Sequence, residues 1–314
     1  MQAQEFVPAK WAVARRARAT ESAVDGAFAD GTILRTHVLR PTWHFVTPED
    51  IPWLLALTGP RVHRLNAYYY RKFGLDADAF ALSRSVFLGA LAGGHRTRAE
   101  LAELLAAAGL PASGLHLGYL LMRAELDGVL ISGAPRGRQQ TYARYEERVP
   151  AAAPVDREAA LAELTRRYLT TRGPATTKDF ASWSSLTVAD ATRGVALNPG
   201  LVSETVAGRT YWSFPGTERA AAGPVVDLIQ GYDEYVMSYG ETKDLLAVGG
   251  VAPAHLHTIL LDGRVIGSWR HTAKARSATV ETSFDRPLTE RERAAVDVAV
   301  ADLGRFLERP TTWR

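Results

Sequence analysis

The chain has 314 residues, of which 46% are hydrophobic and 23% charged, values typical of a soluble globular protein with two or three structural units. It contains no cysteine, which excludes disulfides and thiolate metal sites and favours a cytoplasmic location. No apolar run approaches the roughly 20 residues needed to span a bilayer, and the N-terminus does not resemble a secretion signal.

The net charge is only +3, so the placement of the cations matters more than their total. The cations form groups along the chain, at Arg15, Arg16 and Arg18; at Arg61, Arg64 and Arg71; at Arg96 and Arg98; at Arg136 and Arg138; and at Arg264, Arg270, Lys274 and Arg276. Each group predicts either a local phosphate-binding surface or a solvated helix face.

The first segment, 1–92, is expected to be a winged-helix unit followed by further helices. Helix-forming residues cover 10–18 and 21–28, alternating apolar residues predict strands over 33–39 and 42–46, and a capping signal predicts a helix over 49–57. Two more helices are expected within 59–92. Their three consecutive tyrosines, at 68–70, face three directions on a helix and are interpreted as packing and rim residues.

The second segment, 93–150, carries the clearest pattern. A capping box of Thr97 and Glu100 opens a helix to 108, a second helix covers 114–126, and strands over 129–132 and 139–145 enclose a Gly/Pro tip with Arg136 and Arg138. Helix, turn, helix and hairpin predict a winged helix whose second helix enters a DNA groove while the tip contacts phosphate. A purely structural winged helix is the alternative.

The remaining chain is expected to form two segments. In 151–222, helices from 156 to 170, from 176 through Leu186 and from 187 precede a hairpin over 201–214, which repeats the helix-helix-hairpin arrangement. In 223–314, strands over 258–261 and 265–269 are joined by Asp262-Gly263, and a final helix runs from about 287 to 307. The fold class is α+β, with tandem winged-helix motifs and a strand-rich C-terminal region.

Several motifs taken together resemble the bacterial AlkZ-like family of winged-helix DNA glycosylases over essentially the whole chain. They are Gln-Ala-Gln at 2–4, Pro-Ala-Lys-Trp-Ala at 8–12, Ile-Leu-Arg-Thr at 33–36, Leu-Arg-Pro-Thr-Trp-His at 39–44, Gly-Tyr-Asp-Glu-Tyr at 231–235 and Asp-Gly-Arg-Val-Ile-Gly-Ser-Trp-Arg at 262–270. The resemblance implies a concave basic face and a catalytic Gln-x-Gln at Gln2 and Gln4. Family members carry further residues before this motif, so the segment is expected to fray here.

Two neutral amides suit a substrate whose leaving group is already activated. Alkylation at purine N7 or N3 makes the base cationic and weakens its glycosidic bond, so catalysis requires only a placed water and stabilisation of an oxocarbenium-like sugar. Gln2 and Gln4 can accept from and orient that water. Lys10 lies about two helical turns further on, which favours a monofunctional enzyme with water as the nucleophile.

Further residues are candidates for DNA or substrate binding, namely Arg40, Trp43, His44, Arg136, Arg138, Asp233 and Arg270. His44 is equally well explained as a structural histidine. Asp233 and Glu234 point to opposite faces if extended, and a helix cap or an ion pair with an arginine such as Arg270 is the alternative to stabilising the sugar.

The expected partner is double-stranded DNA with alkylated, possibly crosslinked, bases, and the protein is expected to act as a monomer without a protein or membrane partner. No metal or cofactor is expected, because His255-x-His257 has no carboxylate cluster beside it. The alternative function is a non-catalytic winged-helix DNA-binding protein or transcriptional regulator.

Overall fold

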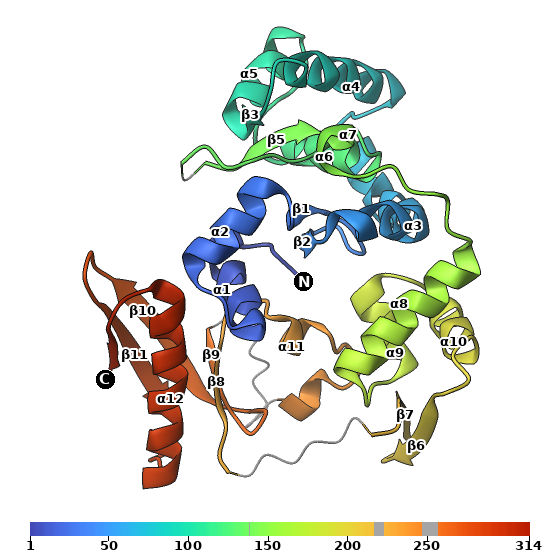
Figure 1. Ribbon diagram of the computed structural model, residues 1–314. Coiled ribbons are helices and arrows are strands. Elements are labelled where there is room, and N and C mark those ends of the chain that lie inside the picture. Colours follow the sequence, from blue (N-terminus) through green and yellow to red (C-terminus); the bar gives the residue numbers. More distant parts are fainter. Residues whose placement is uncertain (138, 217–222, 247–256) are drawn as a thin grey trace. The chain divides into compact units, whose positions relative to one another are not determined.

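The computed structural model describes residues 1–137, 139–216, 223–246 and 257–314 (Figure 1). The chain forms two units: the first comprises Met1–Asp25, Leu164–Trp183 and Val188–Arg314, and the second comprises Gly26–Glu163 and Ser184–Thr187. Both units contain helices and sheets, so the predicted α+β class is confirmed. These units do not coincide with the four segments expected from the sequence, and that division stays a prediction.

The first unit is built on a five-stranded sheet with the order β12-β11-β10-β9-β8. The strands are β8 (Val226–Ile229), β9 (Thr258–Leu261), β10 (Arg264–Ala273), β11 (Ala278–Phe284) and β12 (Thr311–Trp313). Neighbours from β8 to β11 are antiparallel, whereas β12 is parallel to β11. Asp262 and Gly263 both have positive φ, which is the conformation that the predicted two-residue turn requires.

Helix α12 (Glu290–Leu307) lies along this sheet, beside α1 (Phe6–Ala17) (Figure 1). It begins with a capping box of Thr289 and Glu292, as the sequence predicted, and its residues Val296, Val300 and Leu303 repeat at helical spacing and are buried. Burying each such side chain contributes about 1.5–3 kcal/mol. The ring of Trp11 packs 5.3 Å from that of Phe306, which joins α1 to α12.

The helix-helix-hairpin expected in 151–222 is present. It consists of α8 (Arg157–Arg172), α9 (Thr177–Ser184), α10 (Val188–Ala196), β6 (Val202–Val206) and β7 (Arg209–Ser213). Ala175 adds a bridge to Trp212 at the edge of the hairpin. The sequence placed Leu186 inside α9, but the helix ends at Ser184 because Ser185 takes a left-handed conformation with φ of 55°. Short elements α11 (Glu234–Met237) and η2 (Lys243–Leu246) follow β8.

The second unit contains a complete winged helix. It is formed by α4 (Ala77–Leu91), β3 (Arg96–Thr97), α5 (Arg98–Ala107), α6 (Gly114–Leu126), β4 (Leu130–Ser132) and β5 (Thr141–Arg144), followed by α7 (Tyr145–Arg148). The sheet order is β3-β5-β4. The sequence predicted α5, α6 and the hairpin but not β3, whose two residues give no strand signal. Phe87, Leu101, Leu105, Leu120 and Leu121 form the core and are fully buried.

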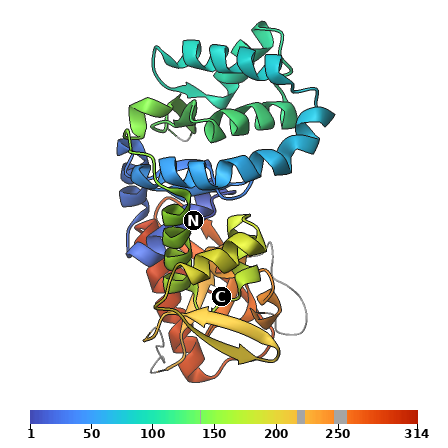
Figure 2. The same cartoon turned by 90° about the vertical axis from the view of Figure 1, so that its right-hand side faces the viewer.

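The same unit contains α2 (Glu21–Asp30) in part, the hairpin β1 (Leu34–His37) and β2 (Trp43–Val46), η1 (Pro48–Asp50) and α3 (Ile51–Lys72). The sequence predicted one helix over 49–57 and separate helices from 59, but α3 is continuous, as Figure 2 shows. Proline removes one backbone hydrogen bond, and the burial of Leu57 and Val62 on either side holds the helix together. Burial of these side chains therefore outweighs the helix-breaking tendency of Pro60.

Candidate active site

The first unit anchors the N-terminal segment through its backbone. The N–H of Gln2 donates to Oε1 of Glu234 at 2.6 Å, and Gln2 is only 3% exposed. Ala3 is fully buried, whereas Gln4 is exposed. The frayed segment expected from the sequence is therefore tied down at its second residue. Gln2 and Gln4 themselves differ: one lies inside the unit and the other reaches its surface.

Glu234, the first residue of α11, gathers several donors. Its Oε2 accepts from Trp183 Nε1 at 2.8 Å, from Arg172 Nη2 at 3.0 Å and from Ser238 Oγ at 3.2 Å. Glu234 is 4% exposed, so this is a buried and hydrogen-bonded ion pair. We call Gln2, Arg172, Trp183, Glu234 and Ser238 the Glu234 cluster. It fixes the position of the residue that begins the Gln-x-Gln motif.

Asp233 lies beside this cluster and is also engaged. Its carboxylate accepts from Tyr235 N at 2.8 Å as the N-cap of α11, and it binds Arg16 through two contacts of 2.6 and 3.0 Å. Burial disfavours the charge of Arg16, but the hydrogen bond and charge of Asp233 outweigh it and raise the pKa of Arg16. Asp233 is thus a helix cap with an arginine partner, which is the alternative role that the sequence offered, but the arginine is Arg16 and not Arg270.

Arg270 takes a different position, on β10. Its guanidinium pairs with Glu281 directly opposite on β11, and Arg314 reaches the same carboxylate at 2.5 Å. Hydrogen bonds from Arg314 and Arg270 lower the pKa of Glu281. Because the Arg270 side chain is 82% exposed, its charge remains available to a ligand in solvent.

In the second unit, the β1–β2 hairpin carries Arg40, Trp43 and His44. His44 is buried: its Nδ1 lies 2.9 Å from the Thr42 carbonyl and its Nε2 lies 3.2 Å from Arg40 Nη2. Both ring nitrogens of His44 therefore lie within hydrogen-bonding distance of groups in the same hairpin. A structural role and a role in DNA binding both stay open for this residue.

Trp43 projects to the other side of the hairpin, as strand alternation predicts. Its ring contacts the guanidinium of Arg35 at 4.4 Å and the ring of His37 at 4.3 Å. His37 in turn pairs with Glu125 of α6, and both side chains are 1% exposed. Burial lowers the pKa of Arg35, and the charge of Glu125 opposes that shift. Trp43 therefore covers a buried, charged network.

The wing of the second unit presents Arg136 at its tip. Its Nη1 donates to Glu100 at 2.9 Å and its Nη2 to the His95 carbonyl at 3.0 Å, with the side chain 53% exposed. The backbone N–H of Thr97, the Arg136 hydrogen bond and the Thr97 hydroxyl lower the pKa of Glu100 to about 2. The second expected tip residue, Arg138, lies outside the described residues.

The expectation that α6 enters a DNA groove stays a prediction, and the helix is more buried than a groove-binding helix requires. From His116 to Leu126, all of which the structure describes, no residue of α6 is exposed. The helix packs against α3, α4 and β1 instead. A recognition helix presents polar side chains to base edges. On α6 the residues after the exposed first turn are buried or half-buried, with the Arg123 side chain 33% exposed.

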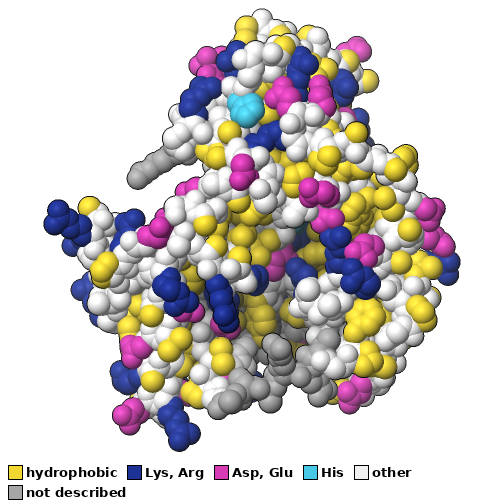
Figure 3. Space-filling view, in the orientation of Figure 1, with side chains coloured by type: hydrophobic (Ala, Val, Ile, Leu, Met, Phe, Trp, Pro, Cys, Tyr) yellow, Lys and Arg dark blue, Asp and Glu magenta, His cyan; other side chains and the backbone are white. Residues whose placement is uncertain are grey.

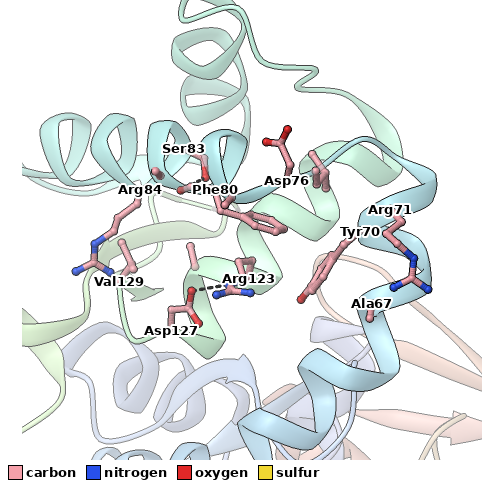
Figure 4. A pocket seen from close by; sticks show the side chains of 14 residues that line it. Ala67, Tyr70, Arg71, Asp76, Phe80, Ser83, Arg84, Arg123, Asp127 and Val129 are labelled. Atoms are coloured by element: carbon pink, nitrogen blue, oxygen red, sulfur yellow. Dashed lines mark hydrogen bonds and ion pairs between the residues drawn. The ribbon is translucent and has the colours of Figure 1, made fainter.

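A hollow of about 560 Å³ opens between α3, α4 and α6 (Figure 4). Tyr70, Phe80 and Arg123 line it, and Arg123 Nε donates to Asp127 at 2.6 Å. None of the residues that the sequence proposed for the site lies among its lining residues. The hollow therefore shares no lining residue with the segment that carries Gln2 and Gln4.

The charges of the surface are mixed. On the face drawn in Figure 3, Lys and Arg side chains are interspersed with Asp and Glu. The concave basic face expected from the resemblance stays a prediction. Within the described residues, no group of three or more His, Asp or Glu side chains is arranged to hold a metal ion. No described helix combines the length and apolarity needed to cross a membrane.

Most of the Glu234 cluster could not be found from local motifs. Arg172 and Trp183 lie 62 and 51 residues from Glu234 in the chain, and no short motif connects them. Only the Gly-Tyr-Asp-Glu-Tyr motif at 231–235 pointed to this region. Arg16 was noted as one of a basic group, without its partner.

Comparisons with known proteins identify the family of the chain and its fold. A family model described as DNA glycosylase AlkZ-like matches residues 1–306. Among solved structures, the Streptomyces sahachiroi DNA glycosylase AlkZ superposes with a TM-score of 0.80 at 22% sequence identity, covering 100% of this chain and 91% of that chain. This likeness shows a shared fold. No curated protein matches the chain.

Proposed function

Because the chain belongs to the AlkZ-like family of DNA glycosylases, we propose that it excises N7- or N3-alkylated purines from duplex DNA by water attack at C1′. The C1′–N bond breaks and both its electrons pass to the purine, which cancels the positive charge of the base. The water oxygen bonds to C1′ and its proton leaves to solvent. The products are a neutral base and an abasic sugar.

The observation that carries the proposal is the anchored Gln-x-Gln segment. The Glu234 cluster holds Gln2 by its backbone, and Gln4 is exposed two residues later, where it can meet solvent and substrate. Placing a water and a sugar requires a fixed scaffold, because small displacements of the reacting groups cost large factors in rate. The side-chain amides of two glutamines can supply hydrogen bonds without supplying a strong base.

The neighbouring carboxylates support the same chemistry. Asp233 binds Arg16, and Glu234 binds Arg172 and Trp183. Each is therefore committed to hydrogen bonds that stabilise its charged form, rather than poised to take a proton from water. An enzyme of this kind relies on the charge of the damaged base. Undamaged DNA and uracil-containing DNA should not be substrates.

Lys10 supports water as the nucleophile. Its Nζ lies 2.7 Å from Glu21 and 2.9 Å from Asp25, and its side chain is 7% exposed. An amine held as an ammonium between two carboxylates cannot attack C1′ to form a Schiff base. A monofunctional mechanism follows, in which the enzyme leaves the DNA strand uncut.

The test is release of 7-methylguanine from alkylated duplex DNA. Gln2→Ala and Gln4→Ala should each lower the release rate by about a hundredfold, the size expected when one positioned hydrogen-bonding group is lost. Duplex affinity should change by less than about twofold. Glu103→Ala, at an exposed position of α5, is the matched surface control.

Unchanged release in both glutamine variants would remove these residues from the mechanism. Binding of duplex DNA without release of any base would support the alternative, a non-catalytic winged-helix protein. Reductive trapping of a covalent protein–DNA adduct with borohydride would contradict the water mechanism.

A further inference from the structure

The C-terminal half of α3 presents an exposed aromatic face on the second unit. Tyr68 is 59% exposed and Tyr69 is 41% exposed, whereas Tyr70 is buried in the core. The three tyrosines thus face different directions, as expected, but two of them face solvent. Exposed aromatic rings that adjoin one another mark an interaction surface more often than isolated ones do.

The rings are held rigidly. Tyr69 stacks on Tyr119 of α6 with centroids 5.3 Å apart and planes within 17°, and Phe73 packs 4.8 Å from His116 of the same helix. Tyr68 stands edge-on to Tyr69 at 5.2 Å. The arrangement fixes the ring of Tyr68 against a packed support, so a ligand that stacks on it would lose little side-chain entropy.

The stretch of α3 that carries these rings contains several cations and no acidic residue. Arg64, Tyr68 and Lys72 follow at intervals of four residues and share one side of α3, with the Lys72 ammonium 6.0 Å from the Tyr68 ring centroid. Between Arg61 and Phe73 the sequence contains four cations and no acidic residue. Within the described part of the chain, neither Arg64 nor Lys72 takes part in an ion pair. We call Arg64, Tyr68, Tyr69 and Lys72 the aromatic–basic face.

We propose that the aromatic–basic face binds single-stranded DNA, with a base stacked on Tyr68 and the adjoining phosphates held by Arg64 and Lys72. Exposed aromatic rings between cations are the chemistry by which proteins hold unpaired nucleotides. Duplex DNA buries its base faces and would use only the cations. An acidic protein would likewise gain little from the rings. The face therefore fits an unpaired polyanion with planar bases.

The proposal does not depend on the reaction at Gln2 and Gln4. A failure of base release leaves it untouched, and a failure of single-strand binding leaves the proposed reaction untouched. The two can be measured separately on the same full-length protein.

The experiment compares two fluorescent oligonucleotides of equal length by anisotropy, one of thymidines and one of abasic tetrahydrofuran nucleotides. Tyr68→Ala should weaken thymidine binding about fivefold or more, because one stacked base is lost, and should leave abasic binding unchanged. Tyr68→Phe, which keeps the ring, should restore the affinity. The Arg64→Ala/Lys72→Ala pair should weaken both oligonucleotides and flatten the salt dependence.

Arg291→Ala/Arg293→Ala removes two exposed cations from α12 and serves as the matched control, with both oligonucleotides bound as by the parent protein. The proposal is overturned if Tyr68→Ala leaves thymidine binding unchanged or weakens abasic binding equally. It is also overturned if a polyglutamate peptide competes with the thymidine strand at equal charge concentration. Melting temperatures confirm that each variant is folded.

Discussion

The N–H of Gln2 donates to the Glu234 carboxylate at 2.6 Å, although the two residues are 232 positions apart in the chain. The contact joins the start of the first unit to α11, which lies far along the chain. It also places the start of the Gln-x-Gln motif against a carboxylate that Arg172 and Trp183 hold from the other side. Four predictions follow from this and from three other contacts.

Glu234→Gln should show whether Glu234 positions the Gln-x-Gln segment for catalysis or only stabilises the fold. The variant keeps an oxygen for Gln2 but presents an amide NH₂ to donors on Arg172 and Trp183, so the cluster loses its charge-assisted bonds. Release of 7-methylguanine should fall at least about tenfold, with little change in duplex affinity, and the Gln2 amide should exchange faster with deuterium. A lower melting temperature with unchanged release would restrict Glu234 to a structural role.

Glu125→Ala should destabilise the second unit. The variant leaves a buried ring nitrogen of His37 without its hydrogen-bond partner, which costs about 1–3 kcal/mol. Unfolding in urea should therefore show a lower midpoint. Glu103→Ala, at an exposed position on the neighbouring α5, should change the free energy of unfolding by less than about 0.5 kcal/mol. Equal effects of the two variants would contradict the buried pair.

Glu100 should make the winged helix sensitive to acid. Its pKa is lowered from 4.5 to about 2, so its carboxylate stabilises the folded state fully above about pH 4.5 and loses that effect as the pH falls toward 2. The difference in unfolding free energy between the parent protein and Glu100→Gln should shrink over this interval. If this difference in unfolding free energy stayed constant down to about pH 2, the charge of Glu100 would not be what stabilises the capping box and the contact with Arg136.

Arg270→Ala should weaken duplex DNA binding without altering stability. Arg270 is exposed and pairs with Glu281 at the surface, where an ion pair contributes little to folding. If it contacts a phosphate, the slope of log affinity against log salt should fall by about one. Arg291→Ala, an exposed cation on α12, is the control. Equal slopes for parent and Arg270→Ala would exclude Arg270 from the DNA interface.

Local signals in the sequence predicted many of the elements correctly. The capping boxes at Thr97 and Thr289 mark helix starts in the structure, and Asp262-Gly263 forms the turn between β9 and β10. Each depends on neighbours within a few residues, so one sequence suffices to find it. Element ends were less certain: β10 continues to Ala273 because it stays paired with β11 beyond the expected end at Trp269.

Contacts between distant residues could not be predicted in this way. The sequence predicted a helix over 49–57 and separate helices from 59, whereas packing keeps α3 continuous from Ile51 to Lys72. The pairs Arg16–Asp233 and Arg172–Glu234 form only once the units have folded. The candidate site was accordingly located by its family motif, and its supporting cluster emerged from the three-dimensional arrangement.

The partial burial of α6 has a consequence for how this protein recognises DNA. A transcription factor needs a helix that discriminates one operator from millions of similar stretches. Damage arises at any position in DNA, so a repair enzyme that bound only one preferred base sequence would miss most of it. With only the first turn of α6 exposed, this winged helix offers few side chains for reading a base sequence, which suits an enzyme that acts wherever damage occurs.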